Sequence, residues 1–256
     1  MLLRISYLKG MKEKSLKQQE EELFAKWKVD YPGFSPDGIV NEAAYLQSQP
    51  RIMLVMKETN SKDGSGVELC AFLENGGRSD KNDAPRKPTW DNVARWVHGI
   101  RNLDEDFNWK YLNDKVRKKI DTWRNTYLPQ LCVMNVKKSA GTHTANAYEL
   151  AAAAEFDKDY LKRQYEIYAQ SSVGRPDLII VCGTDACVAF NNQLGLVTDK
   201  NPWVETSRGL FYSKLENGSV IIWYSHPAAR VDDALLYYGL VDGVREIMKP
   251  HHHTSL

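Results

Sequence analysis

The chain alternates short, fully apolar runs with longer segments in which apolar residues recur at helical spacing. Three of the apolar runs have the length of a strand, at 51–56 (RIMLVM), 131–136 (LCVMNV) and 177–182 (DLIIVC). Continuous apolar strands are typical of a parallel sheet that helices cover on both faces. A fourth unit is a predicted hairpin, because the runs 210–215 and 219–224 flank an Asn-Gly turn.

The segments between these runs carry the helical pattern. Predicted helices lie at 12–28, 90–100, 116–127, 148–170 with a break near Phe156-Asp157, 185–192 and 231–248. The alternation of strands and helices predicts one domain, a three-layer α/β/α sandwich around a mostly parallel sheet of about four strands. We assign residues 1–50 to a helical extension, 51–248 to the core and 249–256 to a tail. The long polar stretch 60–87 is expected to be a lid or an insertion.

Composition narrows the class of protein without naming a function. Apolar residues make up 43% and charged residues 26% of the 256 positions, which is average for a globular chain and excludes a wholly disordered one. No apolar run approaches the roughly 20 residues of a membrane-spanning helix, and the first seven residues do not form a signal peptide. The four cysteines lack paired spacing, so we expect reduced thiols, a cytoplasmic protein and no membrane partner. The net charge of +1 neither requires nor excludes nucleic acid, because phosphate binding depends on local clusters of charge.

Polar side chains follow each predicted strand. The groups after the four strands are Lys57-Glu58-Thr59-Asn60, Asn135 with Lys137 to His143, Gly183-Thr184-Asp185, and Ser225-His226-Pro227 with Arg230. Ligands of open parallel sheets bind beyond the carboxyl ends of the strands, so we expect these groups to converge on one cleft. The sequence has no phosphate-binding loop, dinucleotide fingerprint, serine-hydrolase elbow or zinc-ligand spacing, and we expect neither a metal nor an organic cofactor.

This layout resembles the uracil-DNA glycosylase superfamily, as a divergent member. The most specific match is the stretch SVIIWYSHPAAR at 219–230, which is similar to the family's last strand and its His-Pro-Ser loop, with Ala228 at the Ser position. The resemblance extends roughly over 51–244. The first motif departs from the family, because the stretch from Met56 to Thr59 lacks the family's Gly and Pro and no excluding Tyr follows it. The resemblance therefore implies the α/β/α fold and base excision from DNA without settling which base is removed.

The resemblance also implies roles for individual residues. Asn135 would read the edge of a flipped base, His226 would stabilise negative charge on the departing base, and Glu58 would act near the position of the water-activating carboxylate. An Asn amide offers both a donor and an acceptor, and a positioned donor and carboxylate suit the charges that develop when the N-glycosidic bond breaks. We add Asn60 as a second base-binding candidate. The DNA-binding candidates are Lys137, Lys138, His143 and Arg230.

Simpler interpretations stay open at each position. The His226 ring could cap a strand-end carbonyl, Asn135 could make a turn hydrogen bond, and Glu58 could form a solvated pair with Lys57. At the level of function, the alternatives are a superfamily member that binds nucleic acid or a nucleotide-like ligand without catalysis, and an unrelated α/β enzyme of small molecules. We expect a monomer with DNA as its partner, which acts as a monofunctional DNA N-glycosylase and hydrolyses the N-glycosidic bond of a damaged or deaminated, uracil-like base.

Overall fold

The structure, a computed structural model, describes residues 14–29, 31–61, 65–77, 87–113, 116–141 and 146–249. Its centre is a seven-stranded sheet in the order β1-β3-β2-β4-β7-β6-β5. The four central strands are parallel: β3 (Leu131–Asn135), β2 (Ile52–Met56), β4 (Leu178–Cys182) and β7 (Val220–Tyr224). The predicted α/β class is confirmed.

The strand count differs from the prediction, because three antiparallel strands extend the parallel centre. β1 (Gly38–Ile39) pairs with β3 at one end. At the other end, β6 (Phe211–Lys214) pairs with β7, and β5 (Val204–Glu205) pairs with β6. The sheet is therefore mixed, with seven strands where the sequence predicted about four.

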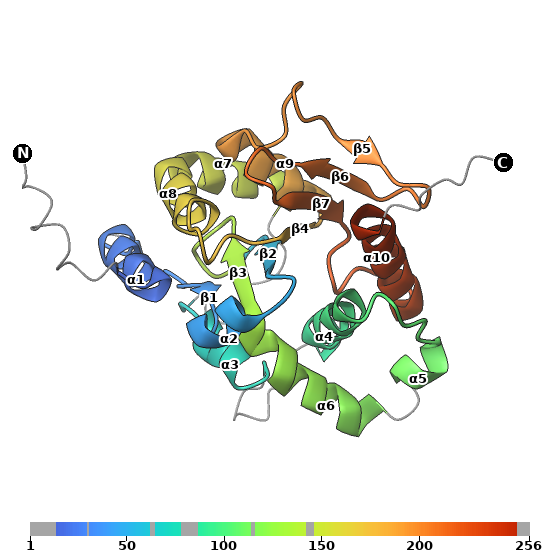
Figure 1. Cartoon of the computed structure of the whole chain (residues 1–256). Helices are drawn as coiled ribbons and strands as arrows, with labels where there is room; N and C mark the ends of the chain where they lie inside the picture. The colour runs from blue at the N-terminus through green and yellow to red at the C-terminus, as the bar shows by residue number, and fades with distance from the viewer. Residues whose placement is uncertain are drawn as a thin grey trace, which may run out of the picture.

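Helices cover both faces of the sheet (Figure 1). One face carries α3 (Leu69–Glu74), α4 (Lys87–Arg101), α5 (Trp109–Asn113), α6 (Val116–Tyr127) and α10 (Asp233–Met248). The other face carries α1 (Leu16–Trp27), α2 (Glu42–Gln47), α7 (Ala147–Phe156), α8 (Lys158–Ala169) and α9 (Thr184–Leu194). A 3-10 turn at Leu128–Gln130 leads into β3.

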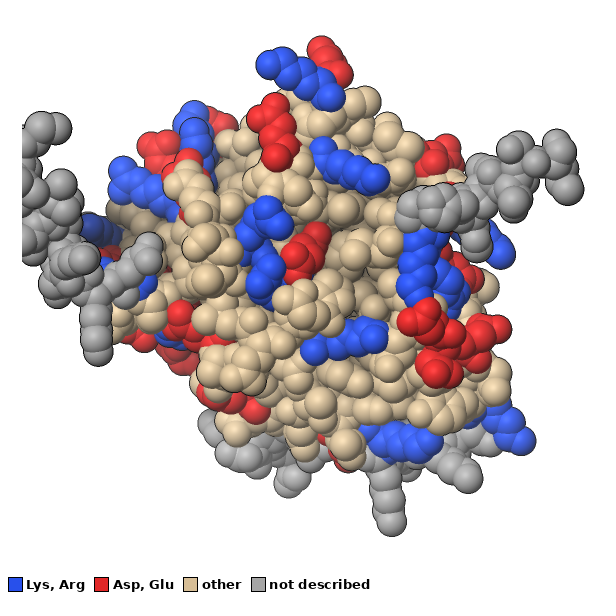
Figure 2. All heavy atoms as spheres, viewed as in Figure 1, with Lys and Arg blue, Asp and Glu red and all other residues tan. Residues whose placement is uncertain are grey.

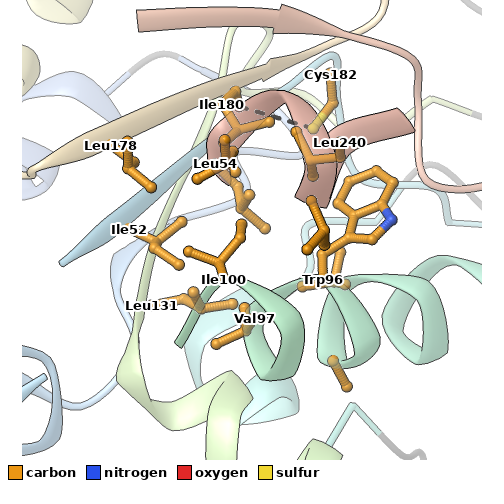
Figure 3. Packing of buried hydrophobic residues seen from close by; sticks show 14 of the residues in the cluster. Ile52, Leu54, Trp96, Val97, Ile100, Leu131, Leu178, Ile180, Cys182 and Leu240 are labelled. Carbon is orange, nitrogen blue, oxygen red and sulfur yellow. Dashed lines mark hydrogen bonds between the residues drawn. The ribbon is translucent and has the colours of Figure 1, made fainter. Parts of the chain in front are cut away.

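The fully apolar strands reflect this covering of both faces. In β2, Ile52 and Leu54 belong to the core under α4, whereas Met53 and Val55 belong to the core under α8. Successive residues of a strand point to opposite faces, so a sheet covered twice needs apolar residues at every position. Figure 3 shows the first core, where strand residues such as Ile52 and Leu131 lie beside Ile100 of α4.

The residues assigned to an N-terminal extension are built into the sandwich where the structure describes them. α1 begins with a capping box, in which the Ser15 hydroxyl accepts the Gln18 N–H and the Gln18 side chain accepts the Ser15 N–H. Phe24 and Trp27 of α1 lie in the core, and β1 continues the sheet. Residues 14–50 therefore support the same strands that end at the candidate site.

Two further predictions have clear outcomes. The break expected near Phe156 is confirmed, because α7 ends there and α8 begins at Lys158. The polar stretch 60–87, expected to be a lid or an insertion, contains α3, whose Leu69 and Leu73 lie in the core. Within the described ranges, no helix is long and apolar enough to cross a membrane.

Candidate active site at the carboxyl ends of the parallel strands

The four parallel strands end together at one edge of the sheet. The register pairs Met56 with Asn135 and Cys182 with Tyr224, so the residues that follow lie side by side along this edge. The segments that follow β2 and β3 also pair with each other, because the Lys137 N–H donates to the Lys57 carbonyl at 2.8 Å. The predicted candidates at the ends of β2, β3 and β7 therefore share this edge.

Asn135 is the last residue of β3, and its side chain is 2% exposed. Its backbone N–H donates to Oδ2 of Asp37 at 2.7 Å. Its Nδ2 is buried and has no hydrogen-bond partner among the described residues. A buried donor without a partner costs about 1–3 kcal/mol, and such groups in native structures call for an explanation. The amide has the donor that a ligand at this edge would use.

Glu58 lies two residues beyond β2 and is also enclosed. Its side chain is 5% exposed, and Oε2 lies 2.5 Å from Nζ of Lys137. Gly141 leaves room for this carboxylate, because an added Cβ there would lie 2.3 Å from Glu58 Oε1. The interpretation of Glu58 as a surface partner of Lys57 is wrong, since Lys57 instead pairs with Asp185 in the first turn of α9 at 2.5 Å.

His226 follows β7 in a loop that holds its ring in one tautomer. The Ala228 N–H donates to Nδ1 at 3.0 Å, so a neutral ring carries its proton on Nε2. Burial lowers the pKa of His226, and the ammonium of Lys57 lowers that pKa further. Asn92 of α4 steadies the loop by donating to the Pro227 carbonyl at 2.8 Å. The ring therefore accepts an amide rather than capping a carbonyl, and it is prepared to donate from Nε2.

A pocket of about 530 Å³ opens beside His226. Its walls come from the exits of β4 and β7 and from the start of β6, including Gly183, Phe211 and Trp223. Gly183 has φ +101°, a conformation that favours glycine, where the chain turns into α9. Glu58 and Asn135 are not among the residues that line this pocket. The structure brings the three main candidates to one edge but does not enclose them in this cavity.

The remaining candidates have mixed outcomes. Lys138 is fully buried, with Nζ 2.7 and 2.6 Å from the two carboxylate oxygens of Asp37, so the prediction that it contacts DNA is wrong. Asn60 is exposed and forms a bridge with Gly141, and Arg230 is exposed in the loop before α10. His143 lies outside the described residues.

Sequence reasoning missed the groups that support these side chains. Asp37 holds Asn135 and Lys138, and Asn92 holds the His226 loop. The local sequence Pro36-Asp37-Gly38 carries only a turn signal. Its partners are about a hundred positions away, and no local pattern predicts such a contact.

Charge on the molecular surface is dispersed. Figure 2 shows Lys and Arg interspersed with Asp and Glu over the visible face rather than gathered in one basic area. In the parts of the chain that the structure describes, no three His, Cys, Asp or Glu side chains are grouped to hold a metal ion.

Comparison with known proteins gives no family for this chain. No protein-family model matches it, and no curated protein matches it. The case for a function therefore depends on the residues at this edge and their contacts.

Proposed function

We propose that this protein hydrolyses the N-glycosidic bond of a damaged or deaminated base in DNA, as a divergent member of the uracil-DNA glycosylase superfamily. The observation that carries the proposal is the pair of donors at one sheet edge, the unpartnered Asn135 amide and the His226 ring with its Nε2 proton. Asn135 ends β3 and His226 follows β7, and two strands, β2 and β4, lie between them. The backbones of β3 and β7 are therefore about 14 Å apart at normal strand spacing.

Each group has a role in the proposed reaction. The target base is first extruded from the stack, at a cost of a few kcal/mol. The Asn135 amide donates to a carbonyl of the base and accepts from a ring N–H. As the bond from C1′ to the base breaks, its electron pair stays on the base, where the Nε2–H of His226 stabilises the charge.

Glu58 completes the chemistry on the sugar side. Its carboxylate faces the positive charge that develops on the sugar and orients the attacking water. The water oxygen binds C1′, and a proton from that water ends on the released base. Lys137 and Arg230 would contact the DNA backbone, and for Lys137 this requires its bond to Glu58 to open.

The proposal extends to the setting of the protein. All four cysteines are free thiols, and three of them are buried, which suits a reducing compartment. We therefore place the protein in the cytoplasm, where it would act as a monomer on DNA.

One observation favours a second candidate function, the binding of nucleic acid or a nucleotide-like ligand without hydrolysis. The Glu58 carboxylate is enclosed and already bound to the Lys137 ammonium at 2.5 Å. A carboxylate held in this way has to exchange its partner before it can orient water. If the Glu58 carboxylate stays bound to Lys137, the Asn135 and His226 donors can still bind a base, but no carboxylate orients the water and the base is left intact.

The experiment that tests the proposal is an excision assay on labelled oligonucleotides. The substrates carry uracil, mismatched thymine, hypoxanthine, xanthine or oxidised pyrimidines, in single and double strands, and alkali reveals abasic sites. We expect wild-type excision of at least one base and a loss of about 10²–10³-fold in His226→Ala. Tyr148→Ala, which alters an 89% exposed ring on α7, is the matched control and should excise normally.

The outcomes separate the candidates. Binding of the oligonucleotides without excision, measured by fluorescence anisotropy, would support the second candidate. Neither binding nor excision by a folded wild-type protein would overturn both.

A further inference from the structure

We propose that Asp37 is a positioning residue for Asn135, and that the buried pair of Asp37 and Lys138 holds the base-reading amide in place through the backbone of β3. This inference rests on the proposed function. The direct observation is the bond from the Asn135 N–H to Oδ2 of Asp37, at 2.7 Å and almost wholly shielded from solvent. Asp37 itself does not touch the base in this scheme.

The side chain of Asp37 stands where backbone pairing has stopped. β1 pairs Gly38 with Val133, and a continued antiparallel ladder would bring Pro36 opposite Asn135. The Pro36 carbonyl instead accepts the Leu69 N–H at 3.3 Å. The Asn135 N–H is therefore held by a carboxylate, and hydrogen bonds to charged groups are roughly twice as strong as neutral ones.

The carboxylate of Asp37 has donors on every side. Lys138 Nζ lies within 2.7 Å of both oxygens, and Gln164 Nε2 donates to Oδ1 at 2.7 Å. Asp37 and its three partners Asn135, Lys138 and Gln164 are each at most 2% exposed. A buried ion pair of this kind often adds nothing to net stability, because desolvation offsets the attraction between the charges. A contribution to stability therefore does not explain why the pair is present. Its hydrogen bond to the Asn135 N–H, which fixes the end of β3, does explain it.

The same segment joins the exits of the two neighbouring strands. The Ser35 N–H donates to the Lys138 carbonyl at 2.6 Å, and the Thr59 hydroxyl beyond β2 donates to Ser35 Oγ at 3.0 Å. Residues 35–37 thus connect the loop that carries Glu58 with the strand end that carries Asn135. A shift of this segment would move both groups.

The unpartnered side chain of Asn135 makes the backbone contact important. Because Nδ2 has no hydrogen-bond partner among the described residues, the backbone contact contributes directly to the position of this donor. A displacement of about 1 Å in a catalytic geometry can cost 10²-fold in rate. Loss of the Asp37 contact should therefore weaken base recognition more than it weakens the fold.

Two double variants test this inference. Asp37→Asn/Lys138→Met and Asp37→Leu/Lys138→Met both remove the buried charges, but only the first leaves an oxygen at position 37 for the Asn135 N–H. We expect the first to keep excision near the wild-type level. We expect the second to lose roughly 10- to 100-fold in kcat/KM, and to have a lower thermal midpoint than the first, because the buried Asn135 N–H loses its acceptor. Equal excision by the two variants would overturn the inference.

A milder variant covers the case in which the double variants do not fold. Asp37→Glu keeps the charge for Lys138 but moves the carboxylate by one methylene relative to the Asn135 N–H. We expect it to fold and to excise more slowly than wild type. Wild-type excision by Asp37→Glu would count against the inference.

A second readout does not depend on catalysis. Hydrogen exchange of the Asn135 backbone amide, followed by NMR, should be slow in wild type and in Asp37→Asn/Lys138→Met and faster in Asp37→Leu/Lys138→Met. Rapid exchange in wild type would contradict the proposed contact even if excision is observed. If wild type excises nothing, the proposed function fails, and the exchange rates still decide whether Asp37 holds Asn135.

Discussion

The His226 ring accepts the Ala228 N–H at Nδ1, and this contact decides which nitrogen of the neutral ring carries the proton. Protonation of the ring would place a hydrogen on Nδ1, which could then no longer accept from the Ala228 N–H. The lowered pKa agrees with this geometry, because both burial and Lys57 oppose a charged ring. His226 is therefore arranged to act as a neutral donor at physiological pH.

The pH dependence of excision follows from this state. The neutral ring persists below its ordinary pKa of about 6.5, so kcat/KM should stay level through neutral pH and fall only in more acid solution. Lys57→Met removes the ammonium that lowers the pKa of His226, and should move the acid limb of the profile to higher pH. The measurement is a pH–rate profile from pH 4 to 9, and an unchanged acid limb in Lys57→Met would contradict the assignment.

Gly141 offers a test of Glu58 that leaves the carboxylate itself intact. In Gly141→Ala, the new Cβ would lie 2.3 Å from Glu58 Oε1, so the flexible side chain has to move. We expect a loss of up to about 100-fold in kcat/KM, with little change in the urea midpoint. Glu58→Gln serves as the reference for full loss of the charge. Normal excision by Gly141→Ala would show that the position of Glu58 is not used.

At the scale of elements, the junction between α7 and α8 is where α1 docks. Asp157 lies at this junction and accepts the Trp27 indole N–H at 2.8 Å and the Tyr31 hydroxyl at 2.9 Å. The break in the helical pattern thus coincides with a polar anchor for the amino-terminal segment.

Removal of this anchor should loosen α1. Asp157→Ala leaves the buried Trp27 N–H without its acceptor, which costs roughly 1–3 kcal/mol of the free energy of unfolding. Asp157→Asn keeps one acceptor oxygen and should lose less. The measurement is urea unfolding, with Glu155→Ala at an exposed neighbouring position as control. Equal losses for Asp157→Ala and the control would rule out the anchor.

Elements with a strong local signal were predictable from the sequence. β2, β3 and β4 lie within one residue of their apolar runs, and the Asn-Gly turn located the hairpin of β6 and β7. β1 and β5 were missed because a two-residue strand has no periodicity to detect. α3 was missed because its six residues sit in a polar stretch, and its place depends on contacts of Leu69 and Leu73 with a distant core.

The candidate site was predictable to the same extent. The strand ends located Asn135 and His226, since the parallel order of the strands places them at one edge. Lys138 was assigned to the surface because a lysine in a polar run is usually exposed. Its burial depends on Asp37, 101 positions earlier, and no local pattern carries that information.

At the scale of the whole molecule, two buried groups give stability opposite dependences on pH. Burial raises the pKa of Glu20 from 4.5 to about 7 despite the nearby Lys17, so the folded chain binds an extra proton between these values. The contribution of Glu20 to stability therefore falls as pH rises through this range. Burial and the charge of Lys119 lower the pKa of His98 from 6.5 to about 4, so its contribution rises with pH between these values.

The two contributions should offset each other in wild type between about pH 4.5 and 6.5. Glu20→Gln should make the free energy of unfolding rise with pH in this window relative to wild type, by on the order of 3 kcal/mol. His98→Gln should make it fall. Urea unfolding at several pH values measures the free energy of unfolding of each variant relative to wild type. The other titrating groups are common to the three proteins, so their contributions cancel in these differences. Parallel curves for all three proteins would contradict these two assignments.

The long separation between Asp37 and its partners has a consequence for how the protein is made. Asp37 leaves the ribosome 98 residues before Asn135 and 101 before Lys138, which is about 5–20 s at synthesis rates of ~5–20 residues per second. During that interval its carboxylate stays hydrated, and the apolar face of α1 has no completed sheet to cover. We expect the amino-terminal segment of the nascent chain to be the part that chaperones bind first, and to release them once α8, on which α1 packs and which carries Gln164, has been synthesised.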